Sequence, residues 1–165
     1  MNPRTKRRII LSTAVAGTLT AVIAGGLLAR SWYRASQLSE KRRDGLALYA
    51  GQKFEQAIAP LSVAARNNDD LEAVLALADC RMRVPEANNR HMVTAAAYFR
   101  AVLSRDERSA AAMRGLLECY VVLGRLPEIG PLARRLLAVA PNDVRAHEIE
   151  LEVLNLTGKF ADAAA

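Results

Sequence analysis

An uncharged and mainly apolar run of 21 residues covers positions 9–29. An α-helix rises about 1.5 Å per residue, so the run is roughly 31 Å long, close to the thickness of the hydrocarbon core of a bilayer. It has no polar face at the helical period, which argues against a buried helix of a globular core. We predict a basic tail over residues 1–8, a single transmembrane helix over 9–29 and a juxtamembrane linker over 30–37.

Side chains suited to a membrane–water boundary follow this run directly: Arg30, Trp32, Tyr33 and Arg34. A cleaved signal peptide would also begin with basic residues, but its apolar region is shorter, roughly 7 to 15 residues. The small-x-small site Ala29-Arg30-Ser31 is also a poor cleavage site, so we favour an uncleaved, single-pass anchor. The compact, acid-free start MNPRTKRR favours an N-terminus that stays inside, and we therefore expect the remaining chain to lie outside the cytoplasm.

Small residues recur every fourth position within the predicted span, at Gly17, Ala21 and Gly25. Helices in a bilayer pair through close backbone packing, which small residues permit. The stripe indicates a homodimer formed through the anchor. The alternative is that it reflects only how common Gly and Ala are in membrane spans.

Beyond the anchor the chain is rich in Ala and Leu, and Gly and Pro occur only at isolated positions. This composition favours helix throughout. The segment that begins at Gly51 recurs in altered form at Gly124 and Gly158, which are 34 residues apart. Ala57 and Ala95 are 38 residues apart, so one unit carries four extra residues, which we place near 85–90. Each glycine is expected to end a first helix where the chain must take φ > 0 or turn tightly, and each hairpin must stack on its neighbours to bury an apolar face.

A 34-residue helical hairpin with this order of small and large residues resembles the tetratricopeptide repeat (TPR) family. The resemblance implies an all-α fold, with the transmembrane helix followed by a short TPR-like α-solenoid; an ordinary helical bundle is the alternative. The implied units are 38–71, 72–109 with its insert near 85–90, 110–143, and a partial fourth unit over 144–165. In the third unit Leu117 and Ile129 replace smaller residues, so we expect that helix pair to be slightly splayed.

The resemblance also implies that the second, fifth, ninth and twelfth positions of each first helix line a binding groove. These positions hold Ser39, Arg42, Leu46, Tyr49, Ala73, Ala76, Cys80, Arg83, Ala111, Arg114, Glu118 and Val121. The candidate partner-binding residues among them are Arg42, Tyr49, Arg83, Arg114 and Glu118. Arginine suits bidentate capture of a carboxylate, although these arginines could equally be only solvated. Leu46 and Leu77 stand where family members that clamp a chaperone C-terminus carry Asn, so that clamp is not expected.

The formal charge of +6 is divided unevenly along the chain. Residues 1–43 hold nine Lys or Arg against one acid, Glu40, while residues 44–165 hold 14 basic and 16 acidic residues, which gives −2. The excess therefore belongs to the membrane flanks, where lipid headgroups attract it. No nucleic-acid partner is expected, and the 34-residue spacing argues against the RNA-reading pentatricopeptide repeats.

No catalytic, metal-binding or cofactor-binding pattern stands out. His91 and His147 have no nucleophile beside them, and Cys80 and Cys119 are expected to be buried hydrophobic side chains. The sequence thus predicts a non-enzymatic, membrane-anchored adaptor that recruits a partner polypeptide. The alternative is a regulatory N-terminal part of a larger membrane-bound enzyme with a catalytic domain downstream, because the sequence stops inside its fourth unit.

Overall fold

The computed structural model describes residues 36–66 and 69–156. Seven α-helices and one short 3₁₀ turn make up these described ranges, which contain no strand. The helices are 36–50, α2 (Phe54–Ala64), α3 (Leu71–Arg83), η1 (Ala87–Asn89), α4 (Arg90–Leu103), α5 (Ala110–Val122), α6 (Leu126–Val139) and α7 (Val144–Leu156). The predicted all-α fold is confirmed over this part of the chain.

The chain divides into two units, Met1–Glu40 and Lys41–Ala165, and the contacts described below lie within the second. The predicted transmembrane helix, its flanking residues 30–34 and its stripe of small residues fall outside the described residues. Within 36–66 and 69–156, no helix is both long and apolar enough to cross a bilayer. The anchor therefore stays a prediction from the sequence.

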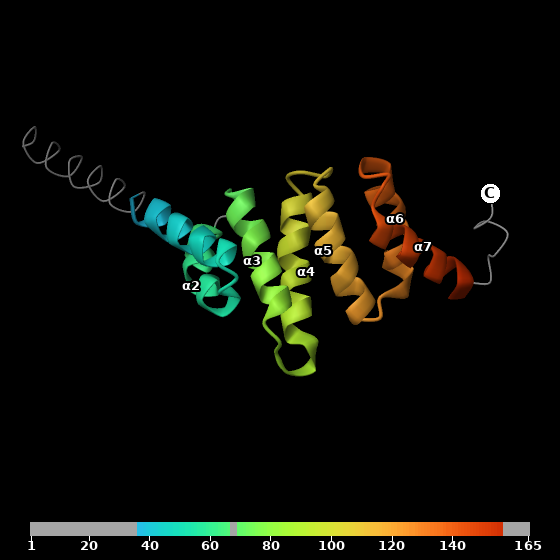
Figure 1. Cartoon of the computed structure of the whole chain (residues 1–165), viewed down its shortest axis with the longest axis horizontal. Coiled ribbons are helices and arrows are strands. Elements are labelled where there is room, and N and C mark those ends of the chain that lie inside the picture. The colour runs from blue at the N-terminus through green and yellow to red at the C-terminus, as the bar shows by residue number, and fades with distance from the viewer. Residues whose placement is uncertain (1–35, 67–68, 157–165) are drawn as a thin grey trace, which may run out of the picture. The chain divides into compact units, whose positions relative to one another are not determined.

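Consecutive helices of the second unit pack against each other in chain order (Figure 1). α2 lies against α3, α3 against α4, α4 against α5, α5 against α6, and α6 against α7. Packing between sequence neighbours is the arrangement of a helical solenoid. Helix 36–50, α3, α5 and α7 are the first helices of successive hairpins, and we call the surface that they share the first-helix face; α2, α4 and α6 are the second helices.

The hairpin turns use one local structure with different residues. In the third hairpin Gly124 takes φ +67°, and the N–H of Arg125 donates to the carbonyl of Tyr120 at 2.9 Å. In the first hairpin the same bonds form around Gln52, which takes φ +58°, with Lys53 N–H donating to Leu48 O at 2.9 Å. As expected, Gly51 follows the last residue of helix 36–50 in a tight turn, but the left-handed residue of that turn is Gln52, one position later.

Glycine has a packing role where two helices meet closely. A Cβ atom added to Gly115 of α5 would lie 2.2 Å from Cζ of Phe99 in α4, so the aromatic ring occupies the space of the missing side chain. Gly45 is covered by Leu61 in the same way, at 2.8 Å. These contacts draw helix pairs together around the buried core of the solenoid.

The polar segment between α3 and α4 is held by side chains at both of its ends. His91 is buried, and its Nδ1 accepts the backbone N–H of Glu86 at 3.0 Å. Arg81 pairs with the Glu86 carboxylate at 3.2 Å, while Asn88 and Asn89 take φ +56° and +55°. Asparagine tolerates this left-handed conformation better than most residues, so the extra residues form a compact turn.

Candidate functional site

The small residues predicted to line the groove are mostly part of the core. Ala73, Ala76 and Cys80 are at most 5% exposed, whereas Ser39 and Ala111 are exposed. What the first-helix face offers to a partner is therefore decided by its polar side chains. These are joined to one another by contacts between successive first helices.

Arg42 of helix 36–50 pairs with two carboxylates at the start of α3. Its Nε donates to Oδ2 of Asp70 at 2.5 Å, and its Nη2 contacts Glu72. The hydrogen bond from Asp70 and the charge of Asp70 raise the pKa of Arg42, with Glu72 adding to the effect. Asp70 also accepts the N–H of Ala73 at 3.2 Å, so the helix cap of α3 and the ion pair share one carboxylate.

Arg114 of α5 makes the matching contact two first helices further along the face. Its Nε and Nη2 donate to Oδ2 of Asp143 at 2.8 and 2.5 Å, and Asp143 caps α7 by accepting the N–H of Ala146 at 3.0 Å. The Asp143 side chain is only 4% exposed. Burial acts to raise its pKa, but the Ala146 N–H and the Arg114 guanidinium outweigh burial and leave the pKa of Asp143 below its ordinary value.

Tyr49 and Arg83 meet at Asp79, midway along α3. The Tyr49 hydroxyl donates to Oδ2 of Asp79 at 3.0 Å, and Nε of Arg83 donates to the same oxygen at 2.8 Å. The Arg83 guanidinium also stands 4.9 Å from the ring centroid of Phe54. Burial raises the pKa of Tyr49, and the negative charge of Asp79 raises it further.

Glu118 joins α5 to α7 through Arg145. Nε of Arg145 donates to Oε1 of Glu118 at 2.9 Å, and its Nη1 donates to Glu148 at 3.3 Å. The hydrogen bond and charge of Glu118 raise the pKa of Arg145. Arg145 was not among the candidates from the sequence, although it completes the contact that Glu118 makes.

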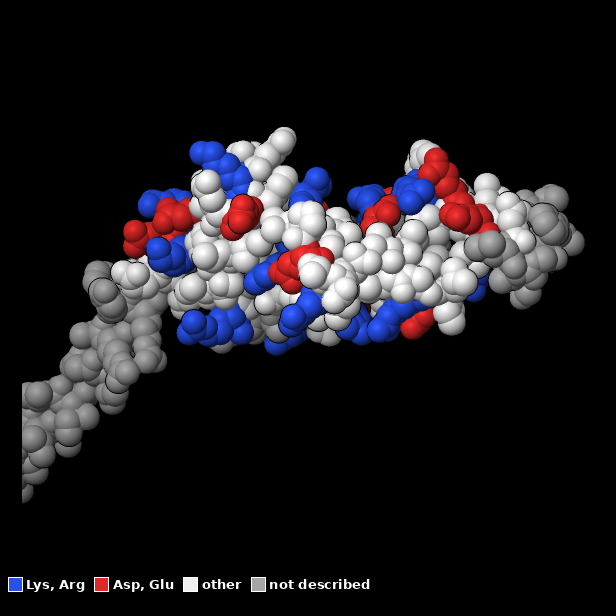
Figure 2. Space-filling view, turned by 90° about the horizontal axis from the view of Figure 1, so that it is seen from below, with Lys and Arg blue, Asp and Glu red and all other residues white. Residues whose placement is uncertain are grey.

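Four of the five candidates, Arg42, Tyr49, Arg114 and Glu118, make polar contacts between successive first helices, which we call the inter-helix bridges. Arg83 joins one of them through a bond within α3, to the same Asp79 that Tyr49 reaches. Two join helix 36–50 to α3 and two join α5 to α7, whereas the equivalent positions between α3 and α5 hold Ala76 and Ser109 in place of Arg and Asp. Figure 2 shows basic and acidic side chains next to each other at several places on the face in view. Sequence reasoning missed Asp70, Asp79 and Asp143; the recurrence of Arg and Asp 28 or 29 residues apart was the signal.

Both cysteines are free and buried, as expected from the sequence. Burial raises the pKa of Cys80 and of Cys119 to about 11, with the neighbouring Asp79 or Glu118 adding to it. Thiols with raised pKa values and no exposure are unreactive. Across the described ranges no group of His, Cys, Asp and Glu side chains is arranged to hold a metal ion.

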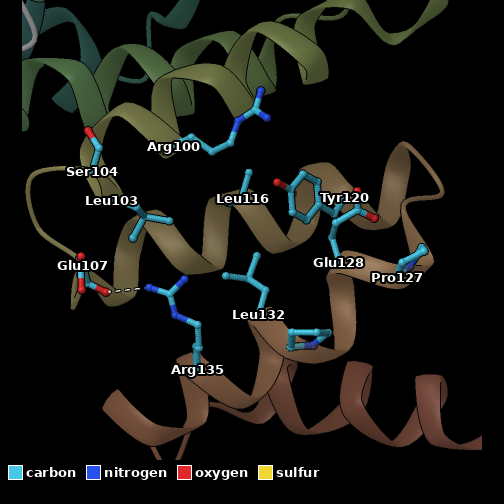
Figure 3. Close-up of a pocket in the computed structure, with 11 residues that line it drawn as sticks. Arg100, Leu103, Ser104, Glu107, Leu116, Tyr120, Pro127, Glu128, Leu132 and Arg135 are labelled. Carbon is cyan, nitrogen blue, oxygen red and sulfur yellow. Dashed lines mark hydrogen bonds between the residues drawn. The ribbon is translucent and has the colours of Figure 1, made fainter.

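A cleft of about 820 Å³ lies on the side of the second helices. It opens between α4 and α6 above α5, and the residues that line it include Arg100, Leu116, Tyr120, Leu132 and Arg135 (Figure 3). The cleft was not predicted from the sequence, because its residues come from three helices and no sequence motif links them.

Comparison with solved structures identifies the class of fold. The first TPR domain of Spaghetti (RPAP3), bound to an HSP90 peptide, matches with a TM-score of 0.63 at 13% identity, over 74% of this chain and 94% of that chain. The TPR domain of Arabidopsis OM64 matches with a TM-score of 0.62 at 16% identity, over 73% and 96%. The C-terminal TPR-containing domain of a putative FK506-binding protein from Plasmodium falciparum matches with 0.61 at 14%, over 78% and 93%.

The solenoid is therefore TPR-like. At these identities the similarity shows the fold alone. No protein-family model matches the chain, and no curated protein matches it either.

Proposed function

We propose that this protein is a membrane-anchored adaptor whose first-helix face recruits a partner polypeptide. The observation that carries the proposal is the set of inter-helix bridges, which hold Arg83, Arg114 and Arg145 in defined positions along successive first helices. Polar side chains that are already fixed lose less conformational entropy when a ligand binds. Such a face suits recognition of an extended or helical peptide better than it suits chemistry.

The arginines that pair with carboxylates still have N–H donors available for a partner. A guanidinium has five N–H donors, and the Arg114 side chain remains 51% exposed although two of its nitrogens donate to Asp143. A carboxylate or backbone carbonyl of a partner can use the outer donors without breaking the bridge. The similarity to a TPR domain bound to an HSP90 peptide supports the same kind of role.

The membrane part of the proposal rests on the sequence of residues 9–29 and their basic and aromatic flanks. A tethered solenoid would hold its partner at the bilayer surface, on the side opposite the cytoplasm. The proposal is a binding role, with no reaction assigned to the described residues.

The partner-binding face can be tested by site-specific photo-crosslinking of the full-length protein in cells. A photoreactive amino acid placed at Arg83 or at Arg145 should give one discrete polypeptide adduct. The same amino acid at Arg66 or Arg90, which are exposed and make no ion pair among the described residues, serves as the matched control. Equal adducts at all four positions, or none at Arg83 and Arg145, would contradict a first-helix binding face.

The membrane anchor is tested separately. Full-length protein should stay with membranes after extraction at alkaline pH, and deletion of residues 9–29 should release it. A reporter that is active only in the cytoplasm, fused after Ala165, should stay silent. Release of the intact chain would overturn the anchor, and an active reporter would reverse the orientation.

A further inference from the structure

The cleft between α4 and α6 has an apolar floor. Leu116 and Tyr120 of α5 form its base, with Leu103 of α4 and Leu132 of α6 beside them (Figure 3). Each of these side chains is buried, at 4–9% exposure, so they belong to the core and present only a small part of their surface to the cleft. A volume of about 820 Å³ lies within the range of pockets that bind peptide side chains or small ligands, roughly 300–1,000 Å³.

Arginines stand on both walls of this cleft. Arg100 projects from α4 and Arg135 from α6, on opposite sides of the apolar floor (Figure 3). Neither forms an ion pair with a carboxylate in the described ranges. Arg100 Nε donates only to the Ala96 carbonyl of its own helix at 3.3 Å, and Arg135 Nη2 donates to the Glu107 carbonyl at 3.4 Å. Both guanidinium groups therefore retain donors for an anion.

Two carboxylates also line the cleft, and one of them is neutralised. Glu128 pairs with Arg125 at 3.6 Å, and the Arg125 guanidinium stands 5.8 Å from the ring centroid of Tyr120. Glu107 contributes its backbone carbonyl to Arg135. The lining itself holds two arginines and two glutamates. Because Arg125 next to the lining offsets the charge of Glu128, Arg100 and Arg135 stand against Glu107 alone, which leaves a local charge of +1 around an apolar floor.

This differs from the first-helix face, where every arginine named above is already paired with a carboxylate. Ion pairs with carboxylates are formed by Arg42, Arg83, Arg114 and Arg145. In the described part of the chain, none is formed by Arg100 or Arg135. An unpaired guanidinium at the edge of a desolvated floor gains more from a carboxylate than one already in an ion pair. The cleft is therefore the stronger of the two sites for an anion.

We propose that the cleft between α4 and α6 is a second docking site, which takes an acidic peptide segment with a bulky apolar side chain flanked by Asp or Glu. The apolar side chain rests on Leu116, Tyr120 and Leu132, and the flanking carboxylates bind Arg100 and Arg135. This site is independent of the first-helix face. One molecule can then hold two polypeptides, or two segments of one.

The test uses full-length protein in mild detergent and a panel of fluorescein-labelled hexapeptides. Each peptide has Asp or Glu at both ends and Leu, Ile, Phe or Trp at its centre, and each has a counterpart with Asn and Gln in place of the acids. Fluorescence anisotropy should show at least one acidic peptide that binds tenfold or more tightly than its neutral counterpart. Its affinity should fall as salt increases.

Two variants locate that binding in the cleft. R100E/R135E should weaken binding of the acidic peptide at least tenfold, whereas R66E/R90E, which changes the charge equally at exposed positions, should change it less than threefold. Ser104→Tyr leaves the charge unchanged and places a ring on the α4 wall, and it should also weaken binding at least tenfold. Circular dichroism and thermal melting establish that each variant is folded.

Any of three results would overturn the proposal: no acidic peptide binds better than its neutral counterpart, the two double variants weaken binding equally, or Ser104→Tyr has no effect. Loss of crosslinks at Arg83 and Arg145 with peptide binding retained would reject the first-helix site alone. The two proposals therefore fail separately.

Discussion

The packing of α5 against α4 depends on a single absent side chain at Gly115. In a helix, Ala is favoured over Gly by about 1 kcal/mol. At Gly115 this gain is opposed by the Phe99 ring, whose Cζ would lie 2.2 Å from the new Cβ. Overpacking a well-filled core costs typically 1–3 kcal/mol, so the clash prevails.

We expect Gly115→Ala to reduce the free energy of unfolding by about 1–2 kcal/mol. Gly130→Ala is the matched control, because its Cβ would meet Val153 Cγ1 at an ordinary 3.4 Å, and it should be neutral or slightly stabilising. Urea denaturation of the full-length protein in mild detergent, followed by circular dichroism, measures both. Equal effects of the two substitutions would show that the ring does not constrain the helix pair.

Asp143 is the buried carboxylate of the inter-helix bridges, and its pKa is lowered in the folded state. A lowered pKa contributes stability that is fully present above the ordinary value near 3.8 and is lost as the pH falls through the folded-state value. Asp143→Asn keeps an oxygen for the Ala146 N–H, since Asn caps helices about as well as Asp, but it removes the charge beside Arg114.

We therefore expect Asp143→Asn to be less stable than the natural protein at pH 7, with the difference shrinking as the pH falls below about 4. Thermal melts between pH 3 and pH 7 measure this. Glu150→Gln, on the same helix α7 and outside the described ion pairs, should show a much smaller difference at pH 7. A difference that is constant with pH would mean that the Asp143 charge does not contribute.

At the scale of elements, the helix caps and the inter-helix bridges share residues. Asp70 and Asp143 cap α3 and α7 and pair with Arg42 and Arg114, while Ser109 stands at the start of α5 without a side-chain cap. Among the described contacts, the junction between α3 and α5 therefore has neither a side-chain cap on α5 nor an inter-helix bridge.

Ser109→Asp should cap α5 and raise the free energy of unfolding by roughly 0.5–1 kcal/mol. Ser109→Ala should change it little, because the serine hydroxyl makes no cap hydrogen bond. The comparison of the two melting curves is the measurement. Destabilisation by Asp would show that α5 starts in a conformation that cannot accept a cap.

Helices could be predicted well from local sequence patterns. Contacts between side chains that lie far apart in the sequence could not. The all-α class and the burial of Cys80 and Cys119 follow from composition and periodicity. The exact left-handed residue of the first hairpin, Gln52 beside Gly51, could not be read from the sequence, since a helix end depends on packing as well as on glycine. The partners of Arg42 and Arg114 lie 28 and 29 residues away, so only the stacking of hairpins brings them together.

At the scale of the whole described solenoid, stability is shared between neighbouring hairpins. Cys80 in α3 and Cys119 in α5 lie in one continuous core, with α4 packed against both helices. In a solenoid, each hairpin is stabilised mainly by its interfaces with its neighbours. The two thiols can therefore report whether adjacent hairpins unfold together.

Both cysteines should resist alkylation in the native protein at pH 8, since their pKa values of about 11 leave few thiolates and both side chains are buried. With increasing urea, both should become labelled at the same concentration, as measured by mass spectrometry of the two peptides. Labelling of one cysteine well before the other would show that adjacent hairpins open independently.

The missing bridge between α3 and α5 has a mechanical consequence. Bending that separates the first helices must break charged hydrogen bonds at the junction of helix 36–50 with α3 and at that of α5 with α7. Between α3 and α5 it meets Ala76 and Ser109, where the described contacts include no such bond. Elastic compliance should then concentrate at this one junction, and native-state hydrogen exchange should be fastest at the N-terminus of α5. The described solenoid should therefore bend mainly at the α3–α5 junction, with a stiffer segment on each side of it.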